Sequence, residues 1–395
     1  MKRHVVLVTN GEQRSSLAVV RSLGRRGHRV VVGAQRARSL AGVSRFASAE
    51  FVLPSPLRDP AGFVRSVIEL RLREDVDVII PTTDDSLLAL LPAREQLLPA
   101  VLPVGGEQAY RAASDKALLQ SIAPRFGIEV PRQMVVSSAA DAGAVDLRFP
   151  VVIKPSRSVS DDGSQILRHV GVRYAGDSIE LADVLAKAAP ESYPLLVQER
   201  VVGPGLGIFL LMWGGKQAAV FSHQRLREKP PSGGVSVYAE SVRPDPDLVD
   251  RSRALLSHLG FEGVAMVEYK LSETSGLPFL MEVNGRFWGS LQLAIDAGVD
   301  FPHLLLSVAI DGLAPEAPVP LVGVRTRWWW GEVDHVLARI RRSPDELGLP
   351  PGAPTRWQAI RDFLRPGTAW DRNQILRLDD LRPAVQETLD WMRRR

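Results

Sequence analysis

The sequence predicts an α/β domain with a doubly wound parallel sheet, followed by a mixed α+β region built from antiparallel hairpins. Short apolar strands alternate with helices over roughly the first 112 residues, which is the pattern of a parallel sheet covered by helices. Beyond that point, apolar stretches come in pairs joined by turns that contain Gly and Pro, as is typical of hairpins. The chain has 395 residues, enough for two or three domains with hydrophobic cores of their own.

Composition favours an ordinary soluble protein. Hydrophobic residues make up 45% of the chain and charged residues 24%. No apolar run reaches the roughly 18 residues that a membrane helix needs, and the start of the chain lacks the features of a signal peptide. The absence of cysteine excludes a disulfide, a thiolate nucleophile and a zinc–thiolate site. We therefore expect a cytoplasmic protein without a membrane partner.

Charge gives no indication of nucleic-acid binding. The formal net charge is +4, and the basic residues are scattered, with one dense run at Arg393, Arg394 and Arg395. A nucleic-acid-binding protein more often shows a basic stripe or a known module. We expect small-molecule partners and no nucleic acid.

The first domain is expected to have strands at 4–9, 29–34, 76–81 and 100–105, with helices between them. Its first turn contains Gly11 alone, so the G-x-G-x-x-G fingerprint of dinucleotide binding is missing. Ligands of such sheets collect at the carboxyl ends of the strands, where the turn PTTDD places Asp84 and Asp85. Asp84 taken alone favours a helix N-cap. Contact of the two aspartates with a substrate is the alternative.

The stretch from 260 to 298 predicts two strands, 264–270 and 277–283, and then a helix. Because side chains alternate along a strand, Glu282 and Asn284 share one face, and Glu268 on the partner strand also faces away from an apolar layer. Two carboxylates and an amide oxygen then converge, which suits Mg²⁺. The alternative is a solvated hairpin with an ordinary charged face. The opposite face is expected to carry Phe279, Met281 and Val283.

This stretch also resembles a known family. The segments VEYK and LMEVNGRFWGS are similar to the last conserved block of the ATP-grasp superfamily, which includes biotin carboxylase, carbamoyl-phosphate synthetase and many carboxylate–amine ligases. The resemblance implies that Glu268, Glu282 and Asn284 hold Mg²⁺ on ATP. It also implies that Arg286, a fork-shaped donor, contacts phosphate or the acyl intermediate. Gly285 stands where many relatives have Pro, and neither residue offers a ligand.

Two lysines match further motifs of the superfamily. Ser114 is expected to cap a helix that carries Lys116, and Lys154 ends the apolar strand of RFPVVIKPS. A half-buried ammonium at a strand end needs an anion, and phosphate is a natural one. The resemblance implies that both lysines contact the phosphates of ATP. The polar segment 156–166 is expected to form a lid.

The resemblance also locates the two ends of an ATP site. One segment corresponds to the strand whose backbone groups hold adenine, and its residues are Gln198, Glu199 and Val201. The segment HQRLREKPP is similar to H-Q-K-x-x-E of biotin carboxylase, which implies that Arg225 holds the carboxylate or acyl phosphate. Gly233 and Gly234 allow backbone amides to approach a ligand closely. His223 is expected to be a hydrogen-bonded structural residue rather than a general base.

The resemblance covers roughly residues 110–312 and implies a division of the chain. The expected units are a pre-ATP-grasp domain (1–112), a small lid subdomain (113–197), a catalytic subdomain (198–312) and a small helical C-terminal appendage (313–395). In the appendage, Trp328, Trp329 and Trp330 are expected in a strand, where alternate rings pack on opposite sides.

The reaction implied is transfer of the γ-phosphoryl group of ATP to a small-molecule carboxylate with release of ADP, followed by attack of an amine on the acyl phosphate. One alternative is a carboxylase or carbamoyl-phosphate-type enzyme that uses bicarbonate. Another is a nucleotide-binding regulatory protein without catalysis, against which the intact Glu268, Glu282 and Asn284 argue. The sequence leaves open the identity of both substrates and whether the chain forms a homodimer.

Overall fold

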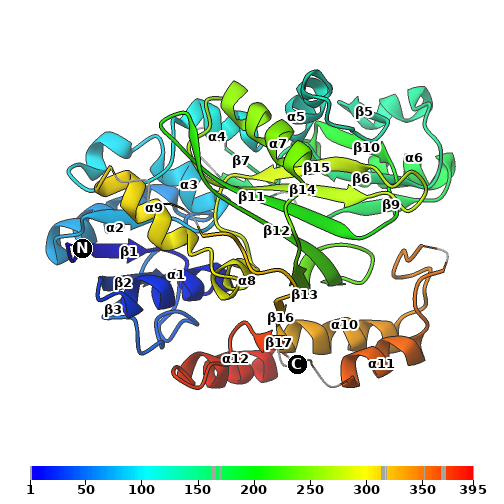
Figure 1. The fold of residues 1–395 in the computed structure, drawn as a ribbon. Helices are drawn as coiled ribbons and strands as arrows, with labels where there is room; N and C mark the ends of the chain where they lie inside the picture. Colours follow the sequence, from blue (N-terminus) through cyan, green and yellow to red (C-terminus); the bar gives the residue numbers. More distant parts are fainter. Residues whose placement is uncertain are drawn as a thin grey trace.

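The computed structural model describes residues 2–161, 166–168, 171–312, 316, 318–350, 352–365 and 371–394. Within them the strands form four sheets, and Figure 1 shows the N-terminal parallel sheet (blue) beside a larger antiparallel sheet (green and yellow). The combination of parallel and antiparallel sheets confirms the predicted fold class. No helix in this described part has the length and apolar character that crossing a membrane requires.

The N-terminal sheet has four parallel strands in the order β3-β2-β1-β4. Helices cover both of its faces, so that Val6 of β1 packs with α1, whereas Leu7 packs with α2 and α3. The elements are β1 (Val5–Val8), α1 (Arg14–Arg25), β2 (Arg29–Ala34), β3 (Ala49–Val52), α2 (Pro60–Glu74), β4 (Val78–Ile80), α3 (Asp84–Leu90), η1 (Arg94–Leu97) and α4 (Glu107–Ala113).

One strand of this domain differs from the expectation. The segment 100–105 forms a single bridge, between Val101 and Val78, rather than a full strand. Pro103 lies in this segment and has no backbone N–H to donate to a neighbouring strand. The fourth strand is instead β3, which pairs with β2.

The second sheet is small and antiparallel, with the order β5-β10-β6-β9 and a hydrophobic core of its own with α6. The helix that precedes it carries Lys116 as predicted, but Asp115 rather than Ser114 caps it, because the Asp115 carboxylate accepts from the Leu118 amide. The elements are α5 (Lys116–Ile122), η2 (Ala123–Phe126), β5 (Gln133–Val136), η3 (Ala139–Ala144), β6 (Val151–Pro155), β9 (Arg173–Ala175), α6 (Ser178–Ala186), η4 (Pro190–Ser192) and β10 (Leu195–Glu199).

The expected lid segment forms a short antiparallel hairpin of β7 (Val159–Asp161) and β8 (Ile166–Arg168). Residues 162–165 of that expectation lie outside the described residues. Val159 and Ile166 are buried in the same hydrophobic cluster as Leu87 of α3. The hairpin therefore rests on the N-terminal domain.

The largest sheet has seven strands in the order β15-β14-β11-β12-β13-β16-β17. Neighbouring residues of β11 face opposite sides, so that Ile208 packs with α7, whereas Phe209 packs with α8 and α9. The elements are β11 (Gly205–Trp213), β12 (Lys216–Lys229), β13 (Val235–Ser241), α7 (Pro246–His258), β14 (Gly263–Leu271), β15 (Pro278–Asn284), α8 (Leu291–Asp296), α9 (Phe301–Ile310), β16 (Arg325–Arg327) and β17 (Asp371–Asn373).

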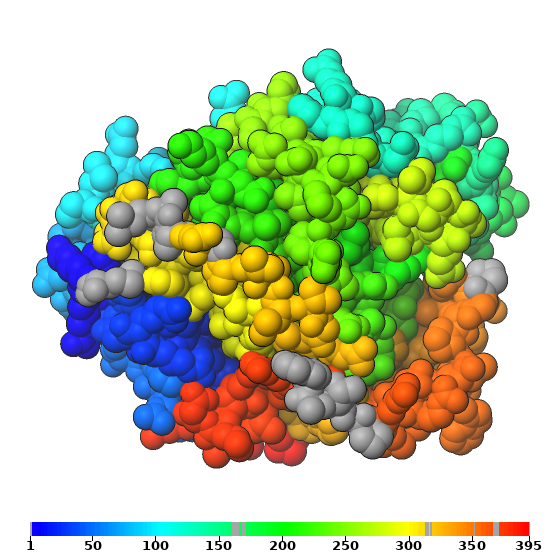
Figure 2. Space-filling view, viewed as in Figure 1, coloured from blue at the N-terminus to red at the C-terminus, as the bar shows by residue number. Residues whose placement is uncertain are grey.

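The C-terminal segment is more than a helical tail, since β16 and β17 extend the large sheet and α12 lies against the N-terminal domain. Figure 2 shows its red surface beside the blue N-terminal surface. Arg21 of α1 donates to the Asp380 carboxylate at 2.9 Å, and both side chains are fully buried. Arg36 also forms an ion pair with Asp390. The helices are α10 (Trp329–Arg341), α11 (Arg356–Leu364) and α12 (Arg382–Arg393).

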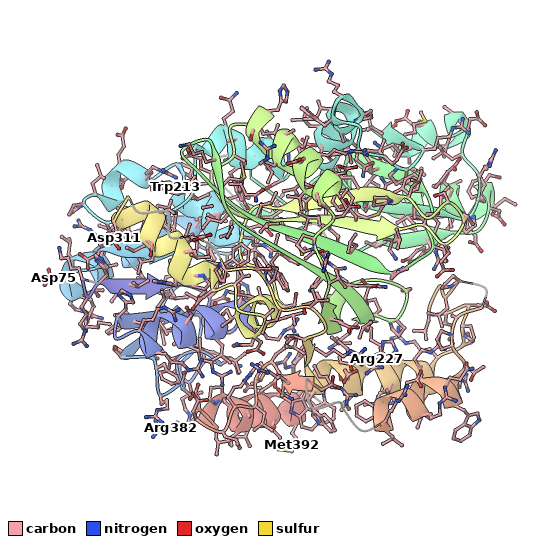
Figure 3. The ribbon with its side chains drawn as sticks, in the orientation of Figure 1. Asp75, Trp213, Arg227, Asp311, Arg382 and Met392 are labelled. Carbon is pink, nitrogen blue, oxygen red and sulfur yellow. The ribbon has the colours of Figure 1, made fainter. Side chains whose placement is uncertain are left out.

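The three adjacent tryptophans do not form the expected strand. Trp328 precedes α10 and the other two open it, so their rings follow helical spacing. Trp330 stacks on Trp391 of α12 at 4.1 Å, which agrees with a packing role. Arg227 extends from β12 toward α10, as Figure 3 shows, and pairs with Glu332.

Candidate active site

A cavity of about 490 Å³ lies between the small sheet and the large sheet. Most of the candidate residues line it, although they come from distant parts of the sequence. These are Lys154, Gln198, Glu199, Val201, Arg225, Gly233, Gly234, Glu268, Glu282, Asn284 and Arg286. Three candidates do not line it: Lys116, Asp84 and Asp85.

The β14–β15 hairpin brings its two carboxylates together. Glu268 and Glu282 occupy directly opposite positions in the strand register. The next pair joins Tyr269 to Leu280, so Met281 is an extra residue in a β-bulge. Met281 therefore lines the cavity, and its expected place on the apolar face with Val283 is wrong. A strict two-residue alternation fails wherever one strand gains a residue.

Each carboxylate of the hairpin has a cationic partner. Arg225 forms a two-pronged hydrogen bond with Glu268, whereas Lys116 lies 3.2 Å from Glu282. The Asn284 amide also donates to Glu282, at 2.8 Å. Burial acts to raise the pKa of Glu282, but Lys116, Asn284 and Lys154 outweigh it and lower the pKa to about 2. Glu282 is therefore ionised at neutral pH.

Glu268 has the opposite tendency. Burial raises its pKa, and repulsion from Glu282 adds to this effect, while Arg225 opposes both. Arg225 is shared, because it also binds Glu228 at 2.8 Å and the carbonyl of Gly234 at 3.0 Å. In the glycine loop we thus find a carbonyl bound to Arg225, where we expected backbone amides to meet a ligand.

Lys154 is a buried ammonium without a carboxylate partner. Only 8% of the residue is exposed, and its Nζ donates to the carbonyl of Met281 at 3.2 Å. It forms no ion pair with any residue that the structure describes. Burial, followed by repulsion from Lys116, lowers the pKa of Lys154 to about 8. Such a group favours an anionic ligand, because a buried charge is costly unless it is paired.

Arg286 connects the hairpin to the N-terminal domain. Its Nε donates to Asp84 at 2.8 Å, and one Nη donates to the side-chain oxygen of Asn284 at 3.1 Å. Thr83, not Asp84, caps α3, which leaves the Asp84 carboxylate to bind Arg286 and the Tyr110 hydroxyl. Burial acts to raise the pKa of Asp84, but Arg286 holds it below its ordinary value. Asp85 is buried in α3, away from the cavity wall.

Another part of the cavity wall is formed by the end of β10 and the residues that follow it, 198–203. The Gln198 side chain is turned into the protein, where its amide donates to Gln120 and Gln133. Arg200 lies over the ring of Tyr174 at 4.7 Å. Because the Gln198 side chain is already hydrogen-bonded, a ligand here would contact the backbone and the ring of Tyr174.

His223 differs from the expectation. Both ring nitrogens are buried without a hydrogen-bond partner among the described residues, so it is not the hydrogen-bonded histidine that we expected. Its ring packs edge-on against Phe209 at 4.7 Å. Burial lowers its pKa to about 3, which keeps the imidazole neutral. It does not line the cavity, so a general-base role has no support.

Sequence reasoning missed several residues of the cavity wall. Arg14, Ser236 and Trp288 line it together with Arg286. Arg14 belongs to the first helix and Ser236 to β13, and no local pattern links them. Of the three, only Trp288 belongs to the motif LMEVNGRFWGS, and its position directly after the hairpin indicates that it lies near the site.

The hairpin suits a hard divalent cation, with one condition. Its ligands would be two carboxylates and one amide oxygen, and Mg²⁺ is commonly held by one or two carboxylates together with substrate phosphates. The described residues contain no group of three His, Cys, Asp or Glu that could hold a metal without such help. Arg225 and Lys116 now neutralise the carboxylates that a cation would use. The donor chemistry fits Mg²⁺ if these side chains shift.

Comparison with known proteins gives three results. Residues 191–330 match the family described as ATP-grasp in the biosynthetic pathway with Ter operon. The carbamoyl phosphate synthase large chain of Thermotoga petrophila is 23% identical over 408 residues, covering 96% of this chain and 35% of that relative. The chain thus spans about a third of the length of such curated relatives.

Solved structures share the fold. An L-amino acid ligase from Bacillus licheniformis aligns with a TM-score of 0.62 and 19% identity, covering 81% of this chain and 79% of that one. The biotin carboxylase domain of Hydrogenobacter thermophilus 2-oxoglutarate carboxylase, solved with MgADP, ADP and bicarbonate, aligns with a TM-score of 0.62 and 14% identity, covering 82% and 74%. Together these matches confirm the predicted resemblance of this chain to the ATP-grasp superfamily.

Proposed function

We propose that this protein is an ATP-dependent ligase that joins a small-molecule carboxylate to an amine. The observation that carries the proposal is the arrangement of charge around the cavity. Lys116, Lys154, Arg225 and Arg286 surround the hairpin carboxylates Glu268 and Glu282. Transfer of a phosphoryl group from ATP needs positive charge and a metal-binding pair of carboxylates in the same place. The matched family and the aligned ligases support the same reading.

In this proposal ATP lies along the cavity with its adenine against the segment Gln198–Val201. Its phosphates extend toward Lys154 and Lys116, and Lys154 gains the anion that its buried ammonium lacks. Glu268, Glu282 and Asn284 would hold Mg²⁺, which neutralises charge on the transferring phosphate oxygens. The β7–β8 hairpin and the rest of 113–197 would act as the cover of the site.

The reacting carboxylate is held by Arg225 and Arg286 in this proposal. One carboxylate oxygen forms a bond to the γ-phosphorus while the bond to the ADP oxygen breaks, which gives an acyl phosphate. The amine nitrogen then attacks the acyl carbon, loses a proton and expels phosphate. A guanidinium can bind the carboxylate before transfer and the phosphate oxygens after it. Asp84 positions Arg286, which would give the domain 1–112 a part in substrate choice.

A second candidate is an enzyme in which bicarbonate takes the place of the carboxylate. The relatives named carbamoyl phosphate synthase large chain favour it, as does the aligned structure that contains bicarbonate. It shares the same site residues. Bicarbonate-dependent release of ADP without any organic carboxylate would favour this candidate over the ligase.

The test of the proposal is a screen of carboxylate and amine pairs for nucleotide products. We expect ADP and phosphate, with a hydroxamate formed when hydroxylamine traps the acyl phosphate. The formation of AMP and pyrophosphate would overturn the mechanism. Absence of any nucleotide product across a broad panel would favour the regulatory protein without catalysis.

A further inference from the structure

Arg14 is a cationic side chain in the cavity wall whose partners are all neutral. It opens α1 and lines the cavity next to Gly289 and Ser236. One Nη donates to the Gln374 side chain, and the other lies 3.5 Å from the carbonyl of Ser236. The guanidinium carbon lies over the Trp328 ring, 3.9 Å from its centroid. Among the described residues Arg14 has no ion pair, unlike Arg225 and Arg286.

The environment of Arg14 disfavours an uncompensated charge. Burial lowers its pKa to about 10, and Glu387 opposes this shift only in part. Glu387 itself is bound to the indole N–H of Trp328 and not to Arg14. A guanidinium has five N–H groups, and the contacts above use two of them. The remaining donors suit an anion, since a desolvated charge is stabilised by pairing.

Two further groups of the same wall lack partners, and this observation does not depend on Arg14. The indole nitrogen of Trp288 and the hydroxyl of Ser236 are buried with no hydrogen bond to any described residue. Trp288 is 1% exposed and Ser236 is 7% exposed. An indole N–H can only donate a hydrogen bond. Unpaired buried donors of this kind are uncommon in proteins and call for an explanation.

Gly289 leaves room for the guanidinium. A Cβ atom at this position would lie 2.8 Å from Nη2 of Arg14. The backbone of Gly289 does not adopt the left-handed conformation. The advantage of glycine at this position is therefore the absence of a side chain. A side chain larger than hydrogen would displace the Arg14 head group.

We propose that Arg14, Ser236 and Trp288 bind a carboxylate that does not react, separate from the one that is activated. This inference rests on the proposed ligase function and names its substrate class. One of the two joined molecules carries a free carboxylate at the end remote from the nucleotide. Its source is either a dicarboxylic acid as the donor or an amino acid as the acceptor. A planar carboxylate matches the two parallel N–H groups of a guanidinium.

The test measures binding with matched probes in the presence of Mg²⁺ and a non-hydrolysable ATP analogue. One arm compares each L-amino acid with its amide, and the other compares dicarboxylates such as glutarate with their monoamides. We expect the best free acid to bind about ten- to a hundredfold more tightly than its amide, the range of a charge-assisted hydrogen bond. The arm in which this preference occurs identifies the source.

Variants then assign the preference to Arg14. R14Q should abolish it and G289A should weaken it, whereas R45Q should retain it. Arg45 is a matched control, because it lies over the ring of Phe46 at 5.5 Å, donates to a backbone carbonyl, has no ion pair among the described residues and does not line the cavity. If R14Q melts early, because Arg14 also contacts Gln374, then G289A and R14K decide.

The outcomes separate the two proposals. A preference that persists in R14Q, or wild-type protein that binds no acid better than its amide, overturns the inference. A merely structural Arg14 would change the melting temperature and leave the acid-to-amide ratio unchanged. The ligase function is judged by ADP release alone. If no ADP is released but the preference for the free acid over its amide is present and depends on Arg14, the ligase function is ruled out. The carboxylate subsite is then still supported.

Discussion

The middle of the cavity and its flanks differ in how their cations are neutralised. In the middle, Glu268 is bound to Arg225, and Glu282 lies beside Lys116, which does not itself line the cavity, so both carboxylates have a cationic partner. On the flanks, Lys154 and Arg14 have neutral partners only among the described residues. The middle must exchange partners when a ligand arrives, whereas the flanks already have capacity for an anion. The first arrangement suits a reaction in which charge moves, and the second suits binding.

The largest effect is expected where the exchange occurs. Glu282→Gln keeps the shape of the side chain but removes the charge that faces Lys116 and would hold the metal. Phosphoryl transfer should fall by roughly a thousandfold, because a metal ion contributes several kcal/mol of charge stabilisation and about 1.4 kcal/mol corresponds to tenfold. The measurement is ADP release at saturating ATP and Mg²⁺.

The control for this change is Glu240→Gln, which removes a charge from the same sheet outside the cavity, where Glu240 pairs with Arg325. It should retain wild-type turnover. Near wild-type turnover in Glu282→Gln would show that the hairpin carboxylate is dispensable and that the middle of the cavity is a structural ion-pair network.

A smaller loss is expected for Arg225→Lys. The variant keeps the charge but loses the two-pronged bond, and a charge-assisted hydrogen bond is worth about 1.5–3 kcal/mol, or roughly tenfold to over a hundredfold in rate. Hydroxamate formation should fall more than nucleotide affinity. Arg227→Lys is the matched control, since Arg227 lies two residues along β12 and pairs with Glu332 outside the cavity. Weaker ATP binding with unchanged trapping per bound nucleotide would contradict the assignment.

The contrast between middle and flanks also marks what sequence can predict. Alternation along two strands was sufficient to bring Glu268 and Glu282 together, because they lie in one hairpin. It failed at Met281, where a bulge changes the faces, and bulges have no reliable sequence signal. The partner of Glu268 is 43 residues away, and Gln374 is 360 residues from Arg14. Such contacts depend on how the sheets pack, which no local pattern encodes.

The N-terminal and C-terminal segments illustrate the same limit. The strands β1, β2 and β4 were predicted because each is a continuous apolar run between turns. The strands β16 and β17 were not, because each has three residues and their polar sequences RTR and DRN show no apolar run. They form because β16 pairs with the free edge of β13, and β17 then pairs with β16. Arg14 meets Gln374 only through this pairing.

The smallest effect is expected from the titration of Lys154. Burial and Lys116 lower its pKa to about 8, and Glu282 and Glu268 oppose this shift. The protonated form binds phosphate, so nucleotide affinity should be constant below about pH 7 and weaken by up to about tenfold per pH unit above 8.

The effect of Lys154 on folding stability has the opposite dependence on pH. The unfolded chain holds this proton up to the ordinary pKa of 10.5, so between 8 and 10.5 the free protein should gain stability from Lys154 as pH rises. Comparison of nucleotide affinity and melting temperature in wild type and Lys154→Met isolates both slopes. Lys270→Met is the control, because Lys270 lines the same cavity and donates to the carbonyl of Gly203. If nucleotide affinity in Lys154→Met still falls above pH 8, another group binds the phosphates. Lys154 is then not the cation that pairs with them.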